Sequence, residues 1–286
     1  MVSRAEVDAA YARCEEITAH EAKNFAYGIR LLSGEKRRAM SALYAFARRV
    51  DDVGDGPGSA ADKLAALAEI RAQIGALGTD VAENDPVLVA LGDAMRTFPI
   101  PQDALGELVT GCEMDCGQQR YETFDDLAVY CRCVAGSIGR LSLGVFGSTD
   151  PSRAPGLADT LGVALQVTNI LRDIVEDRDV MGRIYLPQQD LERFGCTSDA
   201  SGPRAALVDV VRFEASRAHQ RYAEGLELLE LLDHRSRACV SAMAGIYLRL
   251  LVRIERDPLA VVERRVSVPA WEKAWVAARS LAGVGA

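Results

Sequence analysis

The stretch Tyr44-Ala-Phe-Ala-Arg-Arg-Val-Asp-Asp-Val-Gly-Asp55 decides how the rest of this 286-residue sequence is understood. On a helix its polar residues recur at steps of three and four and so share one face: Tyr44, Arg48, Asp51 or Asp52, and Asp55. Carboxylates one turn apart repel each other unless a cation lies between them. Oxygen ligands at this spacing suit Mg²⁺, which shares its coordination shell with substrate phosphates. A solvated acidic helix end is the alternative for one such cluster.

A second stretch later in the chain repeats the pattern, in Gln166-Val-Thr-Asn-Ile-Leu-Arg-Asp-Ile-Val-Glu-Asp177. Its polar residues again fall one turn apart at Gln166, Asn169, Asp173 and Asp177, with Arg172 beside them. Solvated helix ends alone would not explain why the same acidic pattern occurs twice in the chain. Two such helices that face each other predict a cluster of Mg²⁺ ions between them, which would bind a diphosphate.

Composition favours helices over strands. Hydrophobic residues make up 49% and aromatic residues only 6%, with Ala and Leu abundant. No alternation of apolar and polar residues persists long enough to build a sheet, and no Ser/Pro/Gly-rich linker divides the chain. We therefore expect an all-α helical bundle that forms a single domain over residues 1–286.

Charge and cysteine content narrow the classes of function. Lys and Arg number 33 against 41 Asp and Glu, a net charge of −8 that argues against nucleic acid as a partner. The seven cysteines are scattered and odd in number, which suits a reducing compartment rather than a disulfide framework. The pairs Cys112 with Cys116 and Cys131 with Cys133 match no common zinc module. No signal-peptide core and no run of eighteen apolar residues occurs, so a cytoplasmic protein is expected.

Periodicity and helix breakers place the elements. We expect helices over 4–21, 35–53, 62–77, 86–97, 101–119, 124–146, from about 155 to 181, 204–232, 235–256, and a last one through Trp271 and Trp275. Residues 183–187 read as a short extended exit, and 194–202 as a loop. Small residues at Ala135, Gly136, Ser137 and Gly139 allow close approach of either another helix or a flat apolar ligand.

Four motifs in order, Tyr44–Asp55, Tyr130-Cys-Arg-Cys-Val-Ala-Gly136, Asn169–Asp177 and Gly182-Arg-Ile-Tyr-Leu-Pro187, resemble the squalene/phytoene synthase family over nearly the whole chain. Within that family, Ala22–Leu32 is most similar to bacterial presqualene diphosphate synthases of hopanoid pathways. The resemblance implies a helical bundle of the prenyl or terpenoid synthase type that joins two allylic diphosphates head to head.

The resemblance also implies roles for single residues. Asp51 and Asp55 match the first Mg²⁺-binding pair, with Asp52 beside them, and Asn169, Asp173 and Asp177 match the second set. The residues that match diphosphate contacts of the family are Tyr44, Arg48, Arg172, Tyr185 and Arg265. Tyr130 and Gln166 match residues that line the reaction chamber. Phe25 is counted as a substrate contact, although periodicity alone favours the core. Ala22 departs from many relatives, which place a serine there.

The implied reaction is the Mg²⁺-dependent joining of two farnesyl diphosphates to presqualene diphosphate, without a nicotinamide cofactor. Alternatives are a phytoene synthase that uses two geranylgeranyl diphosphates, a squalene synthase that also needs NADPH, a head-to-tail elongase, and an inactive assembly factor. Because the substrate is an amphiphile, weak peripheral contact with the inner face of the membrane is expected. Downstream isoprenoid enzymes are the expected protein partners.

Overall fold

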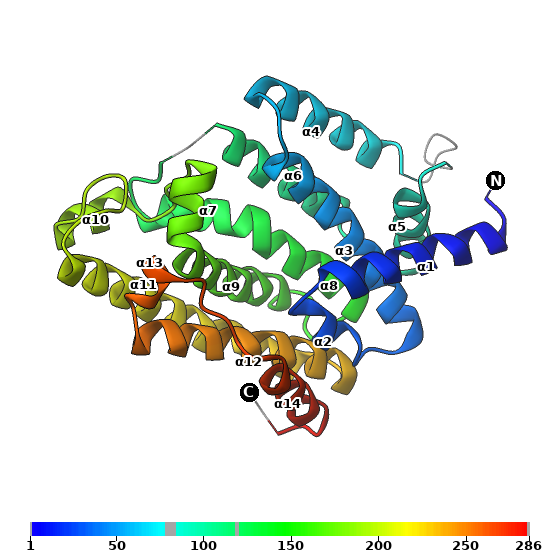
Figure 1. Cartoon of the computed structure of the whole chain (residues 1–286). Coiled ribbons are helices and arrows are strands. Elements are labelled where there is room, and N and C mark those ends of the chain that lie inside the picture. Colours follow the sequence, from blue (N-terminus) through cyan, green and yellow to red (C-terminus); the bar gives the residue numbers. More distant parts are fainter. Residues whose placement is uncertain (1, 78–83, 118–119, 285–286) are drawn as a thin grey trace.

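The computed structural model describes residues 2–77, 84–117 and 120–284, and within these residues every regular element is a helix (Figure 1). The α-helices are α1 Arg4–Glu21, α2 Phe25–Ile29, α3 Gly34–Asp55, α4 Ala60–Gly75, α5 Pro86–Thr97, α6 Gln102–Cys116, α7 Phe124–Cys131, α8 Ser137–Phe146, α9 Ala154–Glu176, α10 Gln188–Phe194, α11 Arg204–Gly225, α12 His234–Arg256, α13 Ala260–Glu263 and α14 Ala270–Leu281. Two π-helical segments, Arg132–Gly136 and Asp177–Met181, and a 3₁₀ segment, Leu226–Leu231, interrupt or extend them. The expected all-α bundle is confirmed.

Helix starts follow local capping chemistry. A capping box at Thr123 starts α7, because the Thr123 hydroxyl accepts a hydrogen bond from the Asp126 amide while the Asp126 carboxylate accepts one from the Thr123 amide. Asp85 caps α5, which begins with Pro86 as predicted. A capping box between Ser59 and Asp62 starts α4 two residues earlier than expected.

Several elements differ from the sequence-based expectation. The single helix expected over 124–146 contains a π-helical turn at Arg132–Gly136, next to the small residues that weaken helix propensity. The long helix expected to reach Leu232 tightens into a 3₁₀ segment after Gly225. Three short helices, α2, α10 and α13, were not predicted because each is only one or two turns long. The predicted end of α6 at Gln119 lies outside the described residues.

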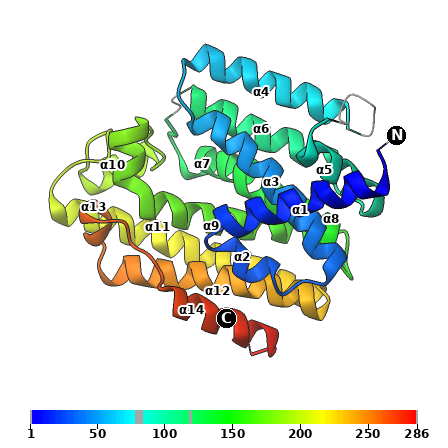
Figure 2. The same cartoon turned by 45° about the vertical axis from the view of Figure 1, so that its right-hand side comes forward.

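Helix α9 occupies the centre of the bundle (Figures 1 and 2). It contacts α8 on one side and α11 and α12 on another, and one hydrophobic core cluster extends from Val7 to Val268. A Cβ atom added at Gly162 of α9 would lie 2.6 Å from the backbone nitrogen of Gly136. The backbone of α9 therefore contacts the backbone of the π-helical segment directly. The small residues at 135–139 therefore serve close helix packing, while Ala135 and Gly139 also line the cavity described below.

The expectation of one domain over residues 1–286 stays a prediction. In the described part of the chain, no helix combines the length and the apolar character that crossing a bilayer requires.

Candidate active site

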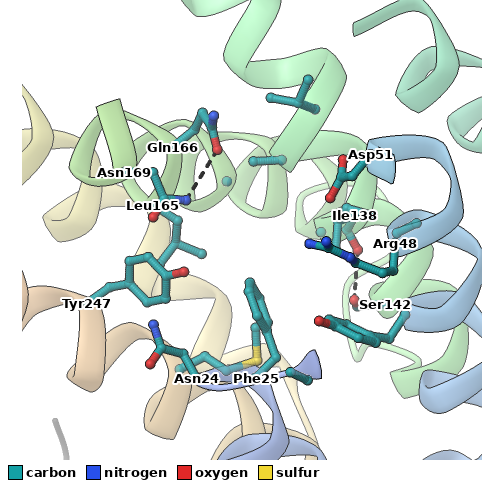
Figure 3. A pocket seen from close by; sticks show the side chains of 18 of the residues that line it. Asn24, Phe25, Arg48, Asp51, Ile138, Ser142, Leu165, Gln166, Asn169 and Tyr247 are labelled. Carbon is teal, nitrogen blue, oxygen red and sulfur yellow. Dashed lines mark hydrogen bonds between the residues drawn. The ribbon is translucent and has the colours of Figure 1, made fainter. Parts of the chain in front are cut away.

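A cavity of about 530 Å³ opens among α2, α3, α8, α9 and α12. Both acidic stretches face it: Asp51 and Asp55 come from α3, and Asn169 and Asp173 come from α9. Figure 3 shows Asp51 with Arg48 on one wall and Asn169 with Gln166 on another, all directed inward. The geometry thus unites two stretches that are far apart in the sequence.

The α3 wall carries two carboxylates, Asp51 and Asp55, that are both exposed within the cavity. Asp51 lines the cavity wall, where partial desolvation together with the charge of Asp55 raises its pKa to about 7. Asp55 accepts a hydrogen bond of 2.7 Å from Arg183. Asp52 does not line the cavity; its side chain is 57% exposed and pairs with Arg48 at 2.7 Å. Adjacent residues lie about 100° apart on a helix, so only one of Asp51 and Asp52 can point inward.

The α9 wall combines carboxylates with arginines. Arg172 forms a two-pronged pair with Asp173, and Arg265 approaches the same carboxylate at 3.4 Å. Asp177 starts the π-helical segment, where desolvation and the charge of Asp173 raise its pKa to about 7. The amide of Asn169 donates to Gln166 at 3.4 Å (Figure 3), and its Oδ1 atom is buried without a hydrogen-bond partner.

The donor set fits an oxygen-coordinated divalent cation such as Mg²⁺. Desolvated carboxylates and the unpartnered Oδ1 of Asn169 are groups that a cation would stabilise. Among the described residues, no three His, Cys, Asp or Glu side chains converge tightly enough to hold an ion by themselves, and Asp55 and Asp173 are ion-paired with arginines. Mg²⁺ commonly completes its shell with waters and substrate phosphates, so a partial set of protein ligands is compatible with such a site.

Asp115 is a cavity residue that the motif analysis missed. It accepts hydrogen bonds from Tyr185 at 2.7 Å and from Tyr130 at 3.0 Å, and the two rings stack with centroids 5.0 Å apart. Burial raises the pKa of its carboxyl group. The signal was available, because Asp115 follows Leu108 and Cys112 at helical spacing and so places an acid on an apolar face.

Arg183 was also missed as a site residue, although it lies inside a quoted motif. Gly182 takes a left-handed conformation (φ 69°) that ends the π-helical segment and turns the chain. Arg183 then reaches across to Asp55 and to the carbonyl oxygen of Gly54 at 3.1 Å, so it links the exit of the second motif to the end of the first.

The other predicted site residues line the same cavity: Phe25, Tyr44, Arg48, Tyr130, Gln166, Arg172, Tyr185 and Arg265. Phe25 packs at 6.3 Å from the ring of Tyr44 and at 6.1 Å from that of Tyr247. The remaining wall is largely apolar, with Ile29, Met40, Leu43, Leu141, Phe146 and Val240 among its residues. A charged region and an apolar region in one cavity suit a ligand with a diphosphate head and a hydrocarbon tail.

Comparison with known proteins identifies the family. A sequence model described as squalene/phytoene synthase matches residues 18–272. The chain belongs to the squalene/phytoene synthase family. Its members are prenyltransferases of isoprenoid biosynthesis that act on prenyl diphosphates, so the chain is an enzyme of this kind.

Similar members of this family include a phytoene synthase from Mycobacterium tuberculosis, 46% identical over 285 residues and covering 97% of this chain and 92% of the relative. A 15-cis-phytoene synthase from Synechococcus elongatus is 35% identical, covering 94% of this chain and 91% of the relative. A crystal structure of a dehydrosqualene synthase with a ligand superposes with a TM-score of 0.84 at 29% identity, covering 98% of each chain.

The relatives found by sequence, which are named phytoene synthases, contradict the expectation of presqualene diphosphate made from two farnesyl diphosphates. That expectation depended on the short segment Ala22–Leu32. Only part of this segment, including Ala22, Phe25 and Ile29, lines the cavity, so it is a poor guide to the product.

Proposed function

We propose that this chain is a phytoene synthase that joins two geranylgeranyl diphosphates head to head. The observation that carries the proposal is the 46% identity to phytoene synthases over 97% of the chain. The cavity supports it, because cationic and acidic side chains share one space with a large apolar wall. The resemblance noted from the sequence already included this reaction as an alternative.

Cationic and hydroxyl donors would bind the diphosphates. Arg48, Arg172 and Arg265 line the cavity near the two acidic sets. Burial raises the pKa of Tyr44 to about 12, so its hydroxyl keeps its proton at neutral pH and can donate to a phosphate oxygen. These donors stabilise negative charge that grows on the leaving group as the allylic C–O bond breaks.

Asp51, Asp55, Asn169, Asp173 and Asp177 would hold Mg²⁺. When bound, Mg²⁺ neutralises the charge of the departing diphosphate. Asp52 is left out of this set because its side chain lies outside the cavity.

The apolar wall would protect the reactive cation from water. Loss of one diphosphate leaves an allylic cation, which must meet the double bond of the second substrate first. Two C20 units joined this way release two diphosphates and two protons, and no electrons are gained or lost. The proposed reaction therefore uses no nicotinamide cofactor.

A competition assay tests this proposal. Purified protein is incubated with equal concentrations of geranylgeranyl and farnesyl diphosphate and Mg²⁺, with and without NADPH, and the hydrocarbons are identified by mass. We expect phytoene as the main product in both arms. A C30 product as the main hydrocarbon would overturn the substrate assignment, and a product formed only with NADPH would overturn the redox-neutral reaction.

A further inference from the structure

The outer face of helix α14 is apolar, which is unusual for a helix at the edge of a protein. Four of its exposed residues are apolar and fall at helical spacing, at Trp271, Ala274, Trp275 and Ala278, with the exposed Arg279 beside them. Trp271 is 70% exposed and Trp275 is 45% exposed, whereas Val276 and Ala277 on the opposite side are buried. A surface helix normally turns a polar face outward. We call Trp271, Ala274, Trp275 and Ala278 the α14 face.

Positive charge surrounds the α14 face. The guanidinium groups of Arg249 and Arg279 lie 5.0 and 4.7 Å from the centre of the Trp275 ring. The sole acid of α14, Glu272, is already paired with Arg249 at 3.2 Å and Arg253 at 2.5 Å. Residues 234–284 carry nine Lys and Arg against four Asp and Glu, a charge of +5, so the rest of this −8 chain carries −13.

Helix α14 also lies near the active-site cavity. Arg265, which lines the cavity, precedes the helix by five residues, and α14 contacts α2, which carries Phe25. Burial and the nearby charges of Arg172 and Lys23 lower the pKa of Lys273. Both of those residues line the cavity, so the inner side of α14 lies close to its polar region.

We propose that the α14 face docks the enzyme on the surface of an anionic lipid bilayer, beside the cavity that receives its substrates. The proposal rests on the function proposed above, since the substrates and the product carry long apolar chains that partition into lipid. Tryptophan rings favour the boundary between lipid headgroups and acyl chains. Arginines around them are attracted to anionic headgroups. Two rings on one short helix give reversible attachment rather than insertion.

Charge favours a bilayer over a second copy of this chain. A symmetric dimer through the α14 face would bring two basic surfaces together, because a two-fold interface pairs the same patch with itself. An anionic bilayer presents the opposite sign to the same patch.

Intrinsic fluorescence can report on this face directly, because Trp271 and Trp275 are the only two tryptophans in the sequence. The protein without substrate is titrated with vesicles of phosphatidylcholine alone or mixed with phosphatidylglycerol. We expect a blue shift and quenching by brominated acyl chains with the anionic vesicles only. No shift with anionic vesicles would overturn the proposal. A concentration-dependent blue shift without lipid, together with a doubled mass, would overturn it in favour of self-association.

Vesicle flotation of variants provides the second measurement. Trp271→Ser and Arg279→Glu should each weaken binding by at least about tenfold, on the scale of losing one buried ring or reversing one surface charge. The control is Leu64→Ser. Leu64 is an apolar residue that is 42% exposed, and it lies on α4, which is distant from α14 in the sequence. Equal losses in all three variants would overturn the assignment to α14.

An activity comparison separates this proposal from the proposed function. With substrate in detergent micelles, Trp271→Ser should match wild type, whereas with substrate in anionic vesicles its rate should fall about tenfold. A farnesyl-specific enzyme that still binds vesicles through α14 would refute the substrate assignment and leave docking intact. A phytoene synthase whose Trp271→Ser variant keeps full vesicle activity and binding would refute docking alone.

Discussion

At the scale of single residues, the position of an acid on its helix decides its use. Asp51 and Asp52 are adjacent, yet Asp51 lines the cavity and Asp52 pairs with Arg48 at the surface. The sequence pattern could not choose between them, because either satisfies the spacing to Asp55. Arg183 was missed for a different reason, because its partner Asp55 lies 128 residues away in the chain.

This difference gives a first prediction. Asp55→Asn and Asp173→Asn should each lower turnover by at least about a hundredfold, the scale of removing one stabiliser of transition-state charge. Asp52→Asn serves as the matched control and should stay within a few-fold of wild type, since its side chain lies outside the cavity. Steady-state kinetics of the three variants would contradict the account if Asp52→Asn were as impaired as Asp55→Asn.

At the scale of elements, long periodic helices could be predicted and short or distorted ones could not. The bounds of α1 and α5 agree with the expectation residue for residue. The π-helical turn at Arg132–Gly136 was not predicted, because it depends on packing against α9 rather than on local propensity. Helix α10 is stabilised by contacts with α11, whose residues are too far away in the sequence for a local pattern to include them.

The contact between α9 and the π-helical turn supplies a second prediction. Gly162→Ala should destabilise the protein by about 1–3 kcal/mol, because the added methyl group would meet the backbone of Gly136. The matched control is Gly156→Ala on the same helix, where an added Cβ meets nothing within 4 Å. That variant should gain up to about 1 kcal/mol through helix propensity. Thermal unfolding that ranks the two variants in the opposite order would contradict the close-packing account.

A buried ionic cluster joins α10 to α11. Arg217 of α11 donates to Asp190 of α10 at 2.5 Å and to Glu214 at 2.7 Å, and it lies 4.7 Å over the ring of Phe124. Glu214 is fully buried, and its Oε2 atom has no partner. Burial raises the pKa of Glu214 to about 8, so the folded protein keeps a proton that the unfolded chain loses.

Because folded Glu214 retains this proton, we expect the stability of the protein to depend on pH. Between the ordinary glutamate pKa and about 8 the folded state binds more protons, so the free energy of unfolding should fall as pH rises through that window. Glu214→Gln carries no such proton and should lack this part of the slope. Denaturant unfolding of both proteins at pH 6 and pH 9 measures it. A larger stability loss in Glu214→Gln than in wild type between these values would contradict the assignment.

At the scale of the whole molecule, the family and the bundle could be predicted from motifs, but the product could not. The motifs could be recognised because their polar residues repeat at helical spacing. In the structure, polar residues from all four motifs line one cavity. We expect product choice to depend on the apolar wall of the cavity, and residues of α2, α3, α8 and α12 from separate stretches contribute to that wall. Association with downstream isoprenoid enzymes stays a prediction.

The central claim is that the acidic sets of α3 and α9 form one Mg²⁺-dependent diphosphate site. Calorimetric titration with an unreactive geranylgeranyl thiolodiphosphate tests it most directly, in Mg²⁺ and in EDTA, for wild type, Asp55→Asn and Asp173→Asn. We predict that removing Mg²⁺ weakens binding to wild type by at least about a hundredfold, or roughly 2.8 kcal/mol, and that each variant loses most of this dependence. Equal affinity of the wild-type protein in Mg²⁺ and in EDTA would contradict the account.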